Sequence, residues 1–459
     1  MSNQRSALGD QKFVVLGLAR QGIALARWLA AQGAEVTVSD IKPAEQLTGA
    51  IDSLQDVPMQ YALGGHPRSL LDDCDVLCLS GGVPIDLPIV VEAQKRQIPL
   101  TNDAQLFIER CPAPIVGITG SAGKTTTTAL LGEMVRAAGY TTWVGGNIGN
   151  PLIGDLDSIR PTDRVVMELS SFQLELMTVS PQVAAVLNIT PNHLDRHPSI
   201  EAYIKAKQHI LDYQLLYDTA VLGYDDPITR KLSGMARGYV RFFSRHKIMG
   251  RGAFVRDERI VLVQNQEADV CPLGDIPLRG AHNVLNVLAA CALASAASVE
   301  PEVMAQVIRS FTGVAHRLQW VRERNRVHYY DDSIATAPER LMAGIQAFDE
   351  PLVLLAGGRD KHLPWAEAAR MIVDRVRQLV VFGEMAELVQ NAVETQWQLA
   401  AGVLEQIHRV TTLDAAMAKA AQVARRGEVV LLSPGGTSYD AFRDFVERGE
   451  KFQELVKAL

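Results

Sequence analysis

A glycine-rich segment in the first third of the chain has residue types that bind phosphate. Residues 115–126 read IVGITGSAGKTT, in which an apolar run leads into two glycines, Lys124 and Thr125. Glycines let backbone N–H groups approach a phosphate, a lysine reaches the terminal phosphates, and a threonine hydroxyl can hold Mg²⁺. Ile118 takes the place of the first glycine in the strict motif. The segment still favours ATP or GTP binding over a turn that only caps a helix.

Two polar clusters follow apolar runs further along the chain. Glu168 ends the run 164–167, where a carboxylate can be a second anchor for Mg²⁺. His193 and Asp195 come soon after the run 183–187, and a histidine there can ligate a metal while the aspartate holds a neighbouring group. The same residue types also occur in solvated or structural roles, and the pattern fits either role.

The first 40 residues have the outline of a nucleotide-binding βαβ unit. An apolar run at 13–16 leads into the turn from Gly17 to Gly22, and Asp40 ends the next apolar run. Ala19 replaces the glycine that would let the backbone approach a pyrophosphate, so a ligand-free packing unit fits as well as a nucleotide site. Asp40 is a candidate acceptor for a hydroxyl group or a base.

The last third of the chain carries charged residues directly after its apolar runs. Arg317 follows a junction near residue 313, Asp331 and Asp332 end one run, and Lys361 follows another. Open parallel sheets bind ligands at the carboxyl ends of their strands. These residues therefore predict a site that faces the phosphate-binding loop across a cleft.

Apolar runs alternate with stretches of helical period through the whole sequence, which predicts α/β architecture with parallel sheets. We expect three domains: an N-terminal Rossmann-like domain, a central P-loop ATPase-like domain with a mostly parallel sheet, and a C-terminal Rossmann-like domain. The predicted boundaries are 1–105, 106–313 and 314–459.

Composition narrows the class of protein. The chain has 459 residues, of which 47% are hydrophobic and 21% charged, as in an ordinary globular protein. A formal net charge of −7 argues against nucleic-acid binding. The five cysteines include no C-x-x-C pair, the N-terminus is polar, and no apolar run approaches the ~20 residues of a membrane span. We expect a cytoplasmic protein with reduced thiols and no membrane insertion.

Taken together, these segments resemble the Mur ligases, the ATP-dependent amide-forming enzymes of peptidoglycan precursor synthesis, and most closely the glutamate-adding MurD type. The resemblance covers essentially the whole chain. The motifs that carry it are Gly120-Ser-Ala-Gly-Lys124-Thr-Thr, Gly146-Asn147-Ile-Gly149, Glu168-Leu-Ser-Ser-Phe-Gln, Asn192-His193-Leu-Asp-Arg-His197, His282-Asn283-Val-Leu-Asn286 and His316-Arg317-Leu-Gln.

The resemblance implies that the first domain binds the UDP part of UDP-N-acetylmuramoyl-L-alanine, the central domain ATP, and the third the incoming D-glutamate. It implies a monomer that uses two Mg²⁺ ions and forms an acyl phosphate. Lys124, His193 and Lys207 are implied as catalytic residues, with Lys207 carbamylated so that it becomes an anionic metal ligand.

The resemblance assigns the remaining site residues to four groups. Those implied for ATP are Gly120, Ser121, Ala122, Gly123, Lys124, Thr125, Thr126, Asn283, Arg317 and Asp332. Those implied for Mg²⁺ are Thr125, Glu168, His193 and Lys207. Those implied for the UDP substrate are Asp40, Ser80, Gly82 and Asn147. Those implied for glutamate are Thr336, Lys361, Ser438 and Phe445.

The chain departs from the family pattern at several positions. Ala122 replaces a usual asparagine, Ile334 a usual lysine, and Gly435-Gly436 a usual Ala-Cys pair. An L-glutamate-adding enzyme, a sibling Mur ligase and a folylpolyglutamate synthase are the alternatives within the ligase class. An NAD-dependent dehydrogenase would leave the phosphate-binding loop unused, and a P-loop switch is disfavoured because no strand-end aspartate of the Walker-B kind is evident.

Overall fold

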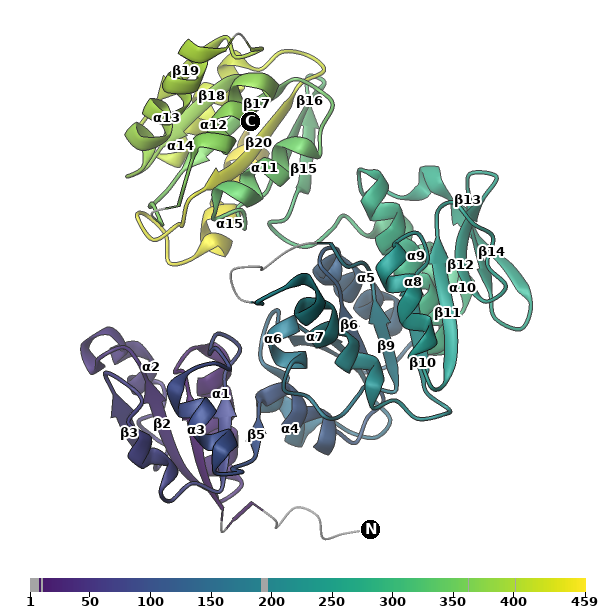
Figure 1. Ribbon diagram of the computed structural model, residues 1–459. Helices are drawn as coiled ribbons and strands as arrows, with labels where there is room; N and C mark the ends of the chain where they lie inside the picture. The colour runs from purple at the N-terminus through teal and green to yellow at the C-terminus, as the bar shows by residue number, and fades with distance from the viewer. Residues whose placement is uncertain (1–7, 10, 191–196, 362, 401) are drawn as a thin grey trace. The chain divides into compact units, whose positions relative to one another are not determined.

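The computed structural model describes residues 8–9, 11–190, 197–361, 363–400 and 402–459, and within them the strands form three sheets (Figure 1). The chain divides into two compact units. The first comprises Met1–Pro277 with Ala281–Phe311, and the second comprises Leu278–Gly280 with Thr312–Leu459.

The first sheet is wholly parallel and has the strand order β3-β2-β1-β4-β5. This order is that of a Rossmann fold without its sixth strand, and it places the turn after β1 at the centre of the carboxyl edge. The elements are β1 (Lys12–Leu16), α1 (Arg20–Ala31), β2 (Glu35–Asp40), α2 (Thr48–Asp52), β3 (Gln60–Leu63), β4 (Val76–Leu79), α3 (Pro88–Lys95), β5 (Leu100–Thr101) and α4 (Asp103–Arg110).

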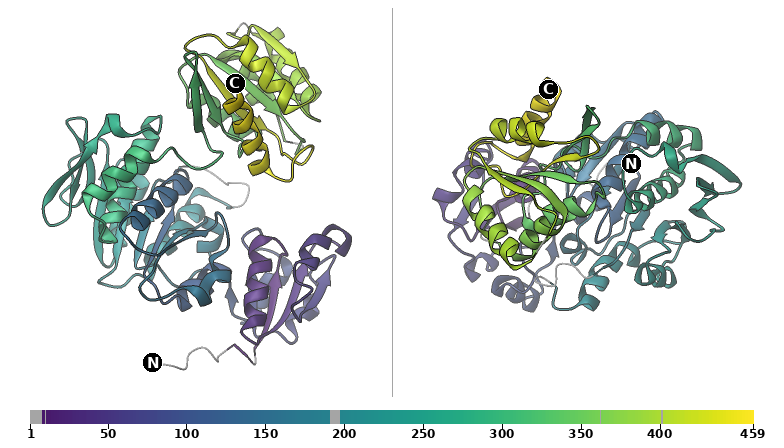
Figure 2. Two further views of the ribbon diagram at one scale, coloured as in Figure 1. Left: turned by 180° about the vertical axis from the view of Figure 1, so that it is seen from behind. Right: turned by 90° about the horizontal axis from the view of Figure 1, so that it is seen from above.

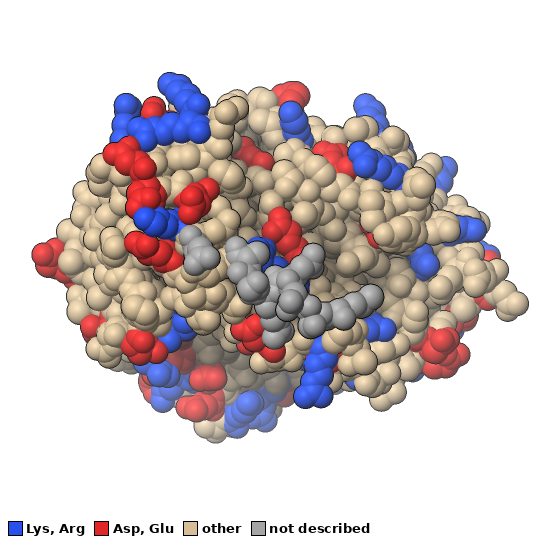
Figure 3. Space-filling view, turned by 90° about the horizontal axis from the view of Figure 1, so that it is seen from below, with Lys and Arg blue, Asp and Glu red and all other residues tan. Residues whose placement is uncertain are grey.

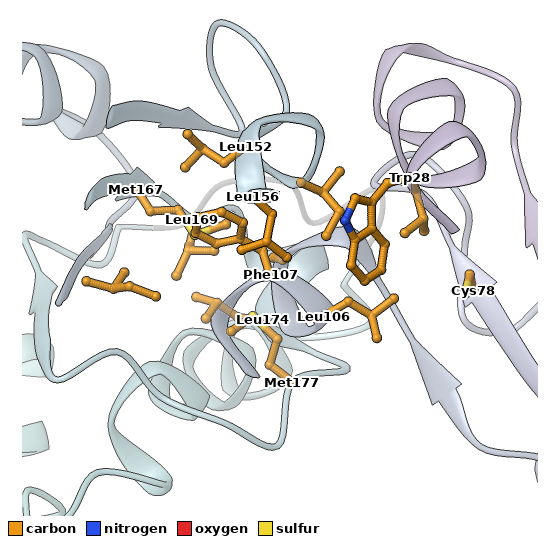
Figure 4. Packing of buried hydrophobic residues seen from close by; sticks show 14 of the residues in the cluster. Trp28, Cys78, Leu106, Phe107, Leu152, Leu156, Met167, Leu169, Leu174 and Met177 are labelled. Atoms are coloured by element: carbon orange, nitrogen blue, oxygen red, sulfur yellow. The ribbon is translucent and has the colours of Figure 1, made fainter. Parts of the chain in front are cut away.

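A continuous hydrophobic core joins this sheet to the next one. Trp28 on α1 packs beside Leu106 and Phe107 on α4, and Leu152 and Leu156 belong to the same cluster (Figure 4). Full burial of such side chains contributes about 1.5–3 kcal/mol each. The two sheets therefore share one compact unit.

The second sheet has nine strands in the order β14-β13-β12-β11-β10-β9-β6-β8-β7. The pairs from β7 to β12 are parallel, and β12, β13 and β14 extend the sheet as an antiparallel meander. The strands are β6 (Ile115–Thr119), β7 (Thr142–Gly146), β8 (Arg164–Glu168), β9 (Val183–Val186), β10 (Thr219–Gly223), β11 (Tyr239–Ser244), β12 (Gly252–Arg256), β13 (Arg259–Val263) and β14 (Glu267–Pro272).

From Val287 to Ala294, helix α9 is apolar and fully buried, and it packs against α5 in the core of this sheet. This packing brings the N-terminal turns of α9 to the phosphate-binding loop that begins α5. The helices are α5 (Lys124–Ala137), η3 (Leu152–Ser158), α6 (Ser171–Leu174), α7 (Ile200–Asp212), α8 (Pro227–Lys231), α9 (Ala281–Ala296) and α10 (Pro301–Ser310).

The second unit is built on a six-stranded sheet with the order β15-β16-β20-β17-β18-β19, in which only the β15–β16 pair is antiparallel. Helices α11, α12 and α13 cover one face of the sheet, and α14 and α15 cover the other (Figure 2). The elements are β15 (Gln319–Arg324), β16 (Val327–Asp331), α11 (Pro338–Gln346), β17 (Leu352–Gly357), α12 (Ala366–Arg375), β18 (Val376–Phe382), α13 (Ala386–Leu399), β19 (Gln406–Arg409), α14 (Leu413–Val423), β20 (Val429–Gly435) and α15 (Phe445–Ala458).

The predicted fold class is confirmed, with three mostly parallel α/β sheets. The boundaries after residues 105 and 313 stay a prediction, while the compact units separate between Phe311 and Thr312. In the part of the chain that the structure describes, no helix is long and apolar enough to cross a bilayer. Basic and acidic side chains are interspersed on the face shown in Figure 3.

Candidate functional site

The phosphate-binding loop connects β6 to α5, as expected from the sequence. Gly123 caps α5 in the left-handed region, with φ of 84°, and a Cβ atom there would lie 2.2 Å from Asn286 Oδ1. Only glycine fits both constraints. The first turn of a helix leaves backbone N–H groups without intrahelical acceptors, so this loop is suited to bind an anion.

Asn188 holds the loop in place from the end of β9. Its side-chain oxygen accepts a hydrogen bond from Ala122 N at 2.9 Å, and its amide donates to Ala122 O at 3.1 Å. Its backbone oxygen accepts a third bond from Ser121 N at 2.9 Å. This supporting role of Asn188 could not be predicted from the sequence, because an asparagine after a strand has no motif of its own.

Helix α9 presents two asparagines beside the same loop. Asn286, which the sequence analysis did not assign to ATP, donates from Nδ2 to Asn283 Oδ1 at 2.9 Å. A cavity of about 50 Å³ adjoins Asn286, and its lining residues are Leu187, Asn188, Gly223, Asp225, Asp226, Phe243, Leu285 and Asn286.

Two residues with different expected roles meet at the buried carboxylate of Glu168. Thr125 Oγ1 donates to one carboxylate oxygen at 2.8 Å, and Asn147 Nδ2 donates to the other at 3.0 Å. Glu168 ends β8 directly beside β6, which explains why its side chain reaches the first turn of α5. A hydroxyl and a carboxylate are the hard oxygen ligands that Mg²⁺ prefers.

Two lysine side chains converge on one backbone carbonyl of the loop. Lys124 Nζ donates to Gly120 O at 2.9 Å, and Lys207 Nζ donates to the same oxygen at 3.1 Å. Lys207 also donates to Thr119 Oγ1 at 3.3 Å, and its side chain is buried. Burial lowers the pKa of the Lys207 amine well below its usual value, and the charge of Lys124 lowers it further.

The polar cluster after β9 lies mostly outside the described residues. Asn192, His193 and Asp195 belong to that undescribed stretch, so the expected metal role of His193 stays a prediction. His197, the last residue of the motif, is buried, shares a hydrogen bond of 2.9 Å with Ser171 Oγ, and stacks on Phe172. Among the described residues, no group of three or more His, Cys, Asp or Glu residues could hold a metal.

The residues expected to bind the UDP substrate border the turn after β1. Asp40 accepts hydrogen bonds from Leu18 N at 2.7 Å and from Lys42 N at 2.9 Å. Ser80 Oγ donates to Leu16 O at 2.9 Å, and a Cβ atom on Gly82 would meet nothing within 4 Å. Asp40 and Ser80 thus fix the shape of this edge of the first sheet, whereas Asn147 follows β7 of the second sheet.

In the second unit, the end of β16 gathers the expected aspartates. Asp331 shares a hydrogen bond of 2.7 Å with His316 Nδ1. Asp332 accepts from Ser433 Oγ at 2.9 Å and from Leu318 N at 3.2 Å. Burial raises the pKa of Asp332 to about 7, and the nearby charge of Arg317 opposes that shift.

The residues expected to bind glutamate lie on three segments of the second unit. Lys361 Nζ donates to Thr336 Oγ1 at 3.1 Å, and burial lowers the pKa of this lysine. Ser438 is buried in the loop after β20. Phe445 begins α15, and its carbonyl oxygen accepts from Ser333 Oγ at 2.8 Å.

The Gly435-Gly436 pair is closely surrounded. Gly435 has φ of 69°, and a Cβ atom there would lie 2.5 Å from Trp365 Cη2. A Cβ atom on Gly436 would lie 2.2 Å from Met385 Sδ and 2.8 Å from Gly357 O. The end of β20 and the loop after it therefore accept no side chain at residues 435 and 436 while Trp365 and Met385 keep their positions.

Three family models match the chain in order. They are the Mur ligase MurD-like N-terminal domain over residues 11–102, the Mur ligase middle domain over 118–294, and the Mur ligase glutamate ligase domain over 316–436.

Curated relatives match along the whole chain. The UDP-N-acetylmuramoylalanine–D-glutamate ligase of Acetivibrio thermocellus is 38% identical over 100% of this chain and 99% of its own. The enzymes of the same name from Clostridium novyi and Symbiobacterium thermophilum are each 39% identical over 98% of this chain, and over 97% and 98% of their own.

Solved structures share the fold at lower identity. The UDP-N-acetylmuramate-alanine ligase MurC of Thermotoga maritima aligns with a TM-score of 0.55 at 19% identity, covering 98% of this chain and 100% of its own. MurF of Acinetobacter baumannii aligns with a TM-score of 0.56 at 17% identity, covering 99% and 93%. Full-length identity near 38%, with matched models for all three domains, settles the relationship. The chain therefore belongs to the Mur ligase family.

Proposed function

We propose that the protein is an ATP-dependent ligase that joins D-glutamate to UDP-N-acetylmuramoyl-L-alanine in peptidoglycan precursor synthesis. The observation that carries this proposal is the full-length identity of 38% to a ligase curated for that reaction. The arrangement of Lys124, Thr125, Glu168 and Lys207 around the phosphate-binding loop supports the chemistry. Because its substrates include a nucleotide sugar and ATP, we propose that it works in the cytoplasm. We also propose that it is a monomer, as the resemblance to the family implies.

In the first step, the carboxylate of the UDP substrate attacks the γ-phosphorus of ATP. A C–O–P bond forms, the bond to the β-phosphate breaks, and ADP leaves, so the product is an acyl phosphate. Negative charge gathers on both reactants, and Lys124 offsets it when its ammonium group exchanges loop carbonyls for phosphate oxygens.

The donor set beside the loop suits Mg²⁺. Thr125 and Glu168 would hold one ion, because their oxygens lie 2.8 Å apart and are hard ligands. Carbamylated Lys207 and His193 would hold a second ion. When bound, Mg²⁺ supplies further positive charge to the phosphates.

The environment of Lys207 supports its carbamylation. Only the neutral amine can attack CO₂, and burial beside Lys124 lowers the pKa of Lys207, so the neutral form is favoured. The new N–C bond forms as the amine loses a proton, which leaves an anionic carbamate. That anion would offset the charge of Lys124, whose ammonium group bonds to the same carbonyl of Gly120.

In the second step, the deprotonated amine of glutamate attacks the acyl carbon, and a tetrahedral intermediate releases phosphate. We propose that Lys361 and Thr336 hold one carboxylate of glutamate and that Ser438 and the backbone of Phe445 hold the other. Water must be excluded because it would hydrolyse the acyl phosphate.

The deciding experiment measures phosphate release from ATP with UDP-N-acetylmuramoyl-L-alanine and either D-glutamate, L-glutamate or no amino acid, with the product mass checked. Release that depends on D-glutamate is the expected result. Release that depends on L-glutamate alone would overturn the choice of amino acid but not the ligase chemistry. The absence of release under all three conditions would contradict the proposed reaction.

A further inference from the structure

The second unit contains two buried arginines that differ in their neutralisation. Arg377 forms ion pairs with Glu428 and Glu405, with nitrogen–oxygen distances of 2.7 and 3.0 Å. Arg448, on α15, is 0% exposed, and among the described residues no carboxylate lies within 4.0 Å of its guanidinium group. A buried arginine without an ion-pair partner is unusual because desolvation of a charge is costly.

Neutral oxygens bind the guanidinium group of Arg448 instead. Its Nε donates to Ser333 Oγ at 3.0 Å, one terminal nitrogen donates to Ser333 O at 2.8 Å, and the other donates to Gly436 O at 3.1 Å. Burial lowers the pKa of Arg448 to about 10, so the group remains a cation at neutral pH.

Two acids, Asp440 and Asp331, act on Arg448 only through space, and their charges raise its pKa against the effect of burial. Asp440 accepts a hydrogen bond from Glu384 N at 3.3 Å, and Asp331 accepts hydrogen bonds from His316, from Gln453 and from Ser333 N. Gly449 permits this arrangement, because a Cβ atom there would lie 2.1 Å from His316 Nδ1. Helix α15 can therefore approach closely enough for the preceding residue, Arg448, to reach Ser333 and Gly436.

The hydrogen bonds of Arg448 connect two of the segments expected to hold glutamate, those of Thr336 and Ser438, and through Ser333 they reach the start of α15 at Phe445. Ser333 lies three residues before Thr336, and Gly436 lies two residues before Ser438. Ser333 in turn donates to the carbonyl oxygen of Phe445 at 2.8 Å. A single side chain thus fixes the spacing of the segments.

We propose that Arg448 is a positioning residue for the amino-acid substrate: it holds the segments of Thr336, Ser438 and Phe445 in register, and its buried positive charge, which has no described carboxylate within 4.0 Å, favours a dicarboxylate over a neutral amino acid. The inference rests on the proposed function. A cation in a low-dielectric region acts over a longer distance than one in water, so Arg448 assists without touching the substrate.

The test separates charge from shape with two variants. Arg448→Gln keeps hydrogen-bond donors but removes the charge, whereas Arg448→Lys keeps the charge but removes the planar fork. Kinetic constants are measured for D-glutamate and for the UDP substrate, together with the melting temperature of each variant. Arg377→Gln is the matched control, since it removes a buried arginine that is already neutralised.

We expect Arg448→Gln to raise the KM for glutamate by about 20-fold and Arg448→Lys by less than about 5-fold, with the KM for the UDP substrate changed by less than about 2-fold in both. Arg377→Gln should lower the melting temperature without changing either KM. Equal KM values for glutamate in the Gln and Lys variants, or equal increases for both substrates, would overturn the inference. Failure of the proposed function is distinct, because the unsubstituted chain would then show no glutamate-dependent turnover.

Discussion

Two strand–turn–helix units in the first compact unit share a shape but differ in charge. The turn between β1 and α1 is neutralised by the protein's own acid, since Asp40 accepts from Leu18 N at 2.7 Å. The turn between β6 and α5 is held by the neutral Asn188 and carries the amines of Lys124 and Lys207. A strand–turn–helix unit therefore does not by itself determine which ligand binds. The residues that border each turn decide whether the turn can bind an anion.

The largest expected effect comes from removing the cation of the second turn. Lys124→Ala should lower kcat for ligation by about 1000-fold, because nothing else on the loop replaces its charge at the transferred phosphate. Phosphate release and product mass give the measurement. Arg136→Ala, at the far end of α5, is the control and should keep a rate near that of the unsubstituted protein. If Lys124→Ala has the same rate as this control, the loop after β6 does not differ in phosphate chemistry from the turn after β1.

Loss of the second amine should have the next largest effect. Lys207→Ala should lower kcat by about 100-fold, and short carboxylic acids should restore part of the rate if a carbamate acts there. Activity should fall as pH drops through the lowered pKa of Lys207, because the protonated amine cannot take up CO₂. Removal of CO₂ at constant pH should have the same effect, and an unchanged rate would contradict the carbamate.

Glycine-to-alanine changes in the two strand–turn–helix units should separate an effect on ATP binding from an effect on packing. Gly123→Ala should abolish the rise in melting temperature that ATP causes. The new Cβ would displace the side chain of Asn286, and residue 123 has a left-handed backbone that alanine disfavours. Gly22→Ala should lower the free energy of unfolding by about 2 kcal/mol and keep that rise, because its Cβ would meet Gly17 O at 1.9 Å. Thermal unfolding with and without ATP gives the measurement. Loss of the ATP-dependent rise in Gly22→Ala, with the rise kept in Gly123→Ala, would contradict the assigned difference between the two units.

The smallest expected effect concerns the acid of the first turn. Asp40→Asn should raise the KM for the UDP substrate by about 10-fold, since an amide cannot accept from both Leu18 N and Lys42 N. The KM for ATP should not change. Equal increases in both KM values would show that Asp40 acts on the stability of the whole unit.

Much of the fold could be predicted because buried parallel strands are recorded as continuous apolar runs. The run at 115–119 and its glycines define both β6 and the loop. The strands from β10 to β14 were not predicted. Arg241 interrupts the apolar residues of β11, and acidic residues interrupt the short strand β14 up to Asp269, so neither strand stands out as a continuous apolar run.

The site could be predicted only where a residue stands in a local motif. Lys124 and Thr125 stand in the glycine-rich motif that follows one apolar run, and Glu168 directly ends another, so their positions follow from the sequence. Asn188 and Arg448 act through tertiary contacts that no local pattern records. An arginine on an amphipathic helix normally indicates a solvated face, and only the packing of α15 shows that Arg448 is buried.

The crowded loop after β20 has an evolutionary consequence. Trp365 fills the space beside Gly435, and Met385 fills the space beside Gly436, so each glycine and its neighbour cannot change independently. A side chain at position 435 would be tolerated only after Trp365 had been replaced by a smaller residue, so the order of substitutions is constrained. Residue 365 should therefore be small in relatives with alanine at position 435, and the effects of the two changes should be strongly non-additive.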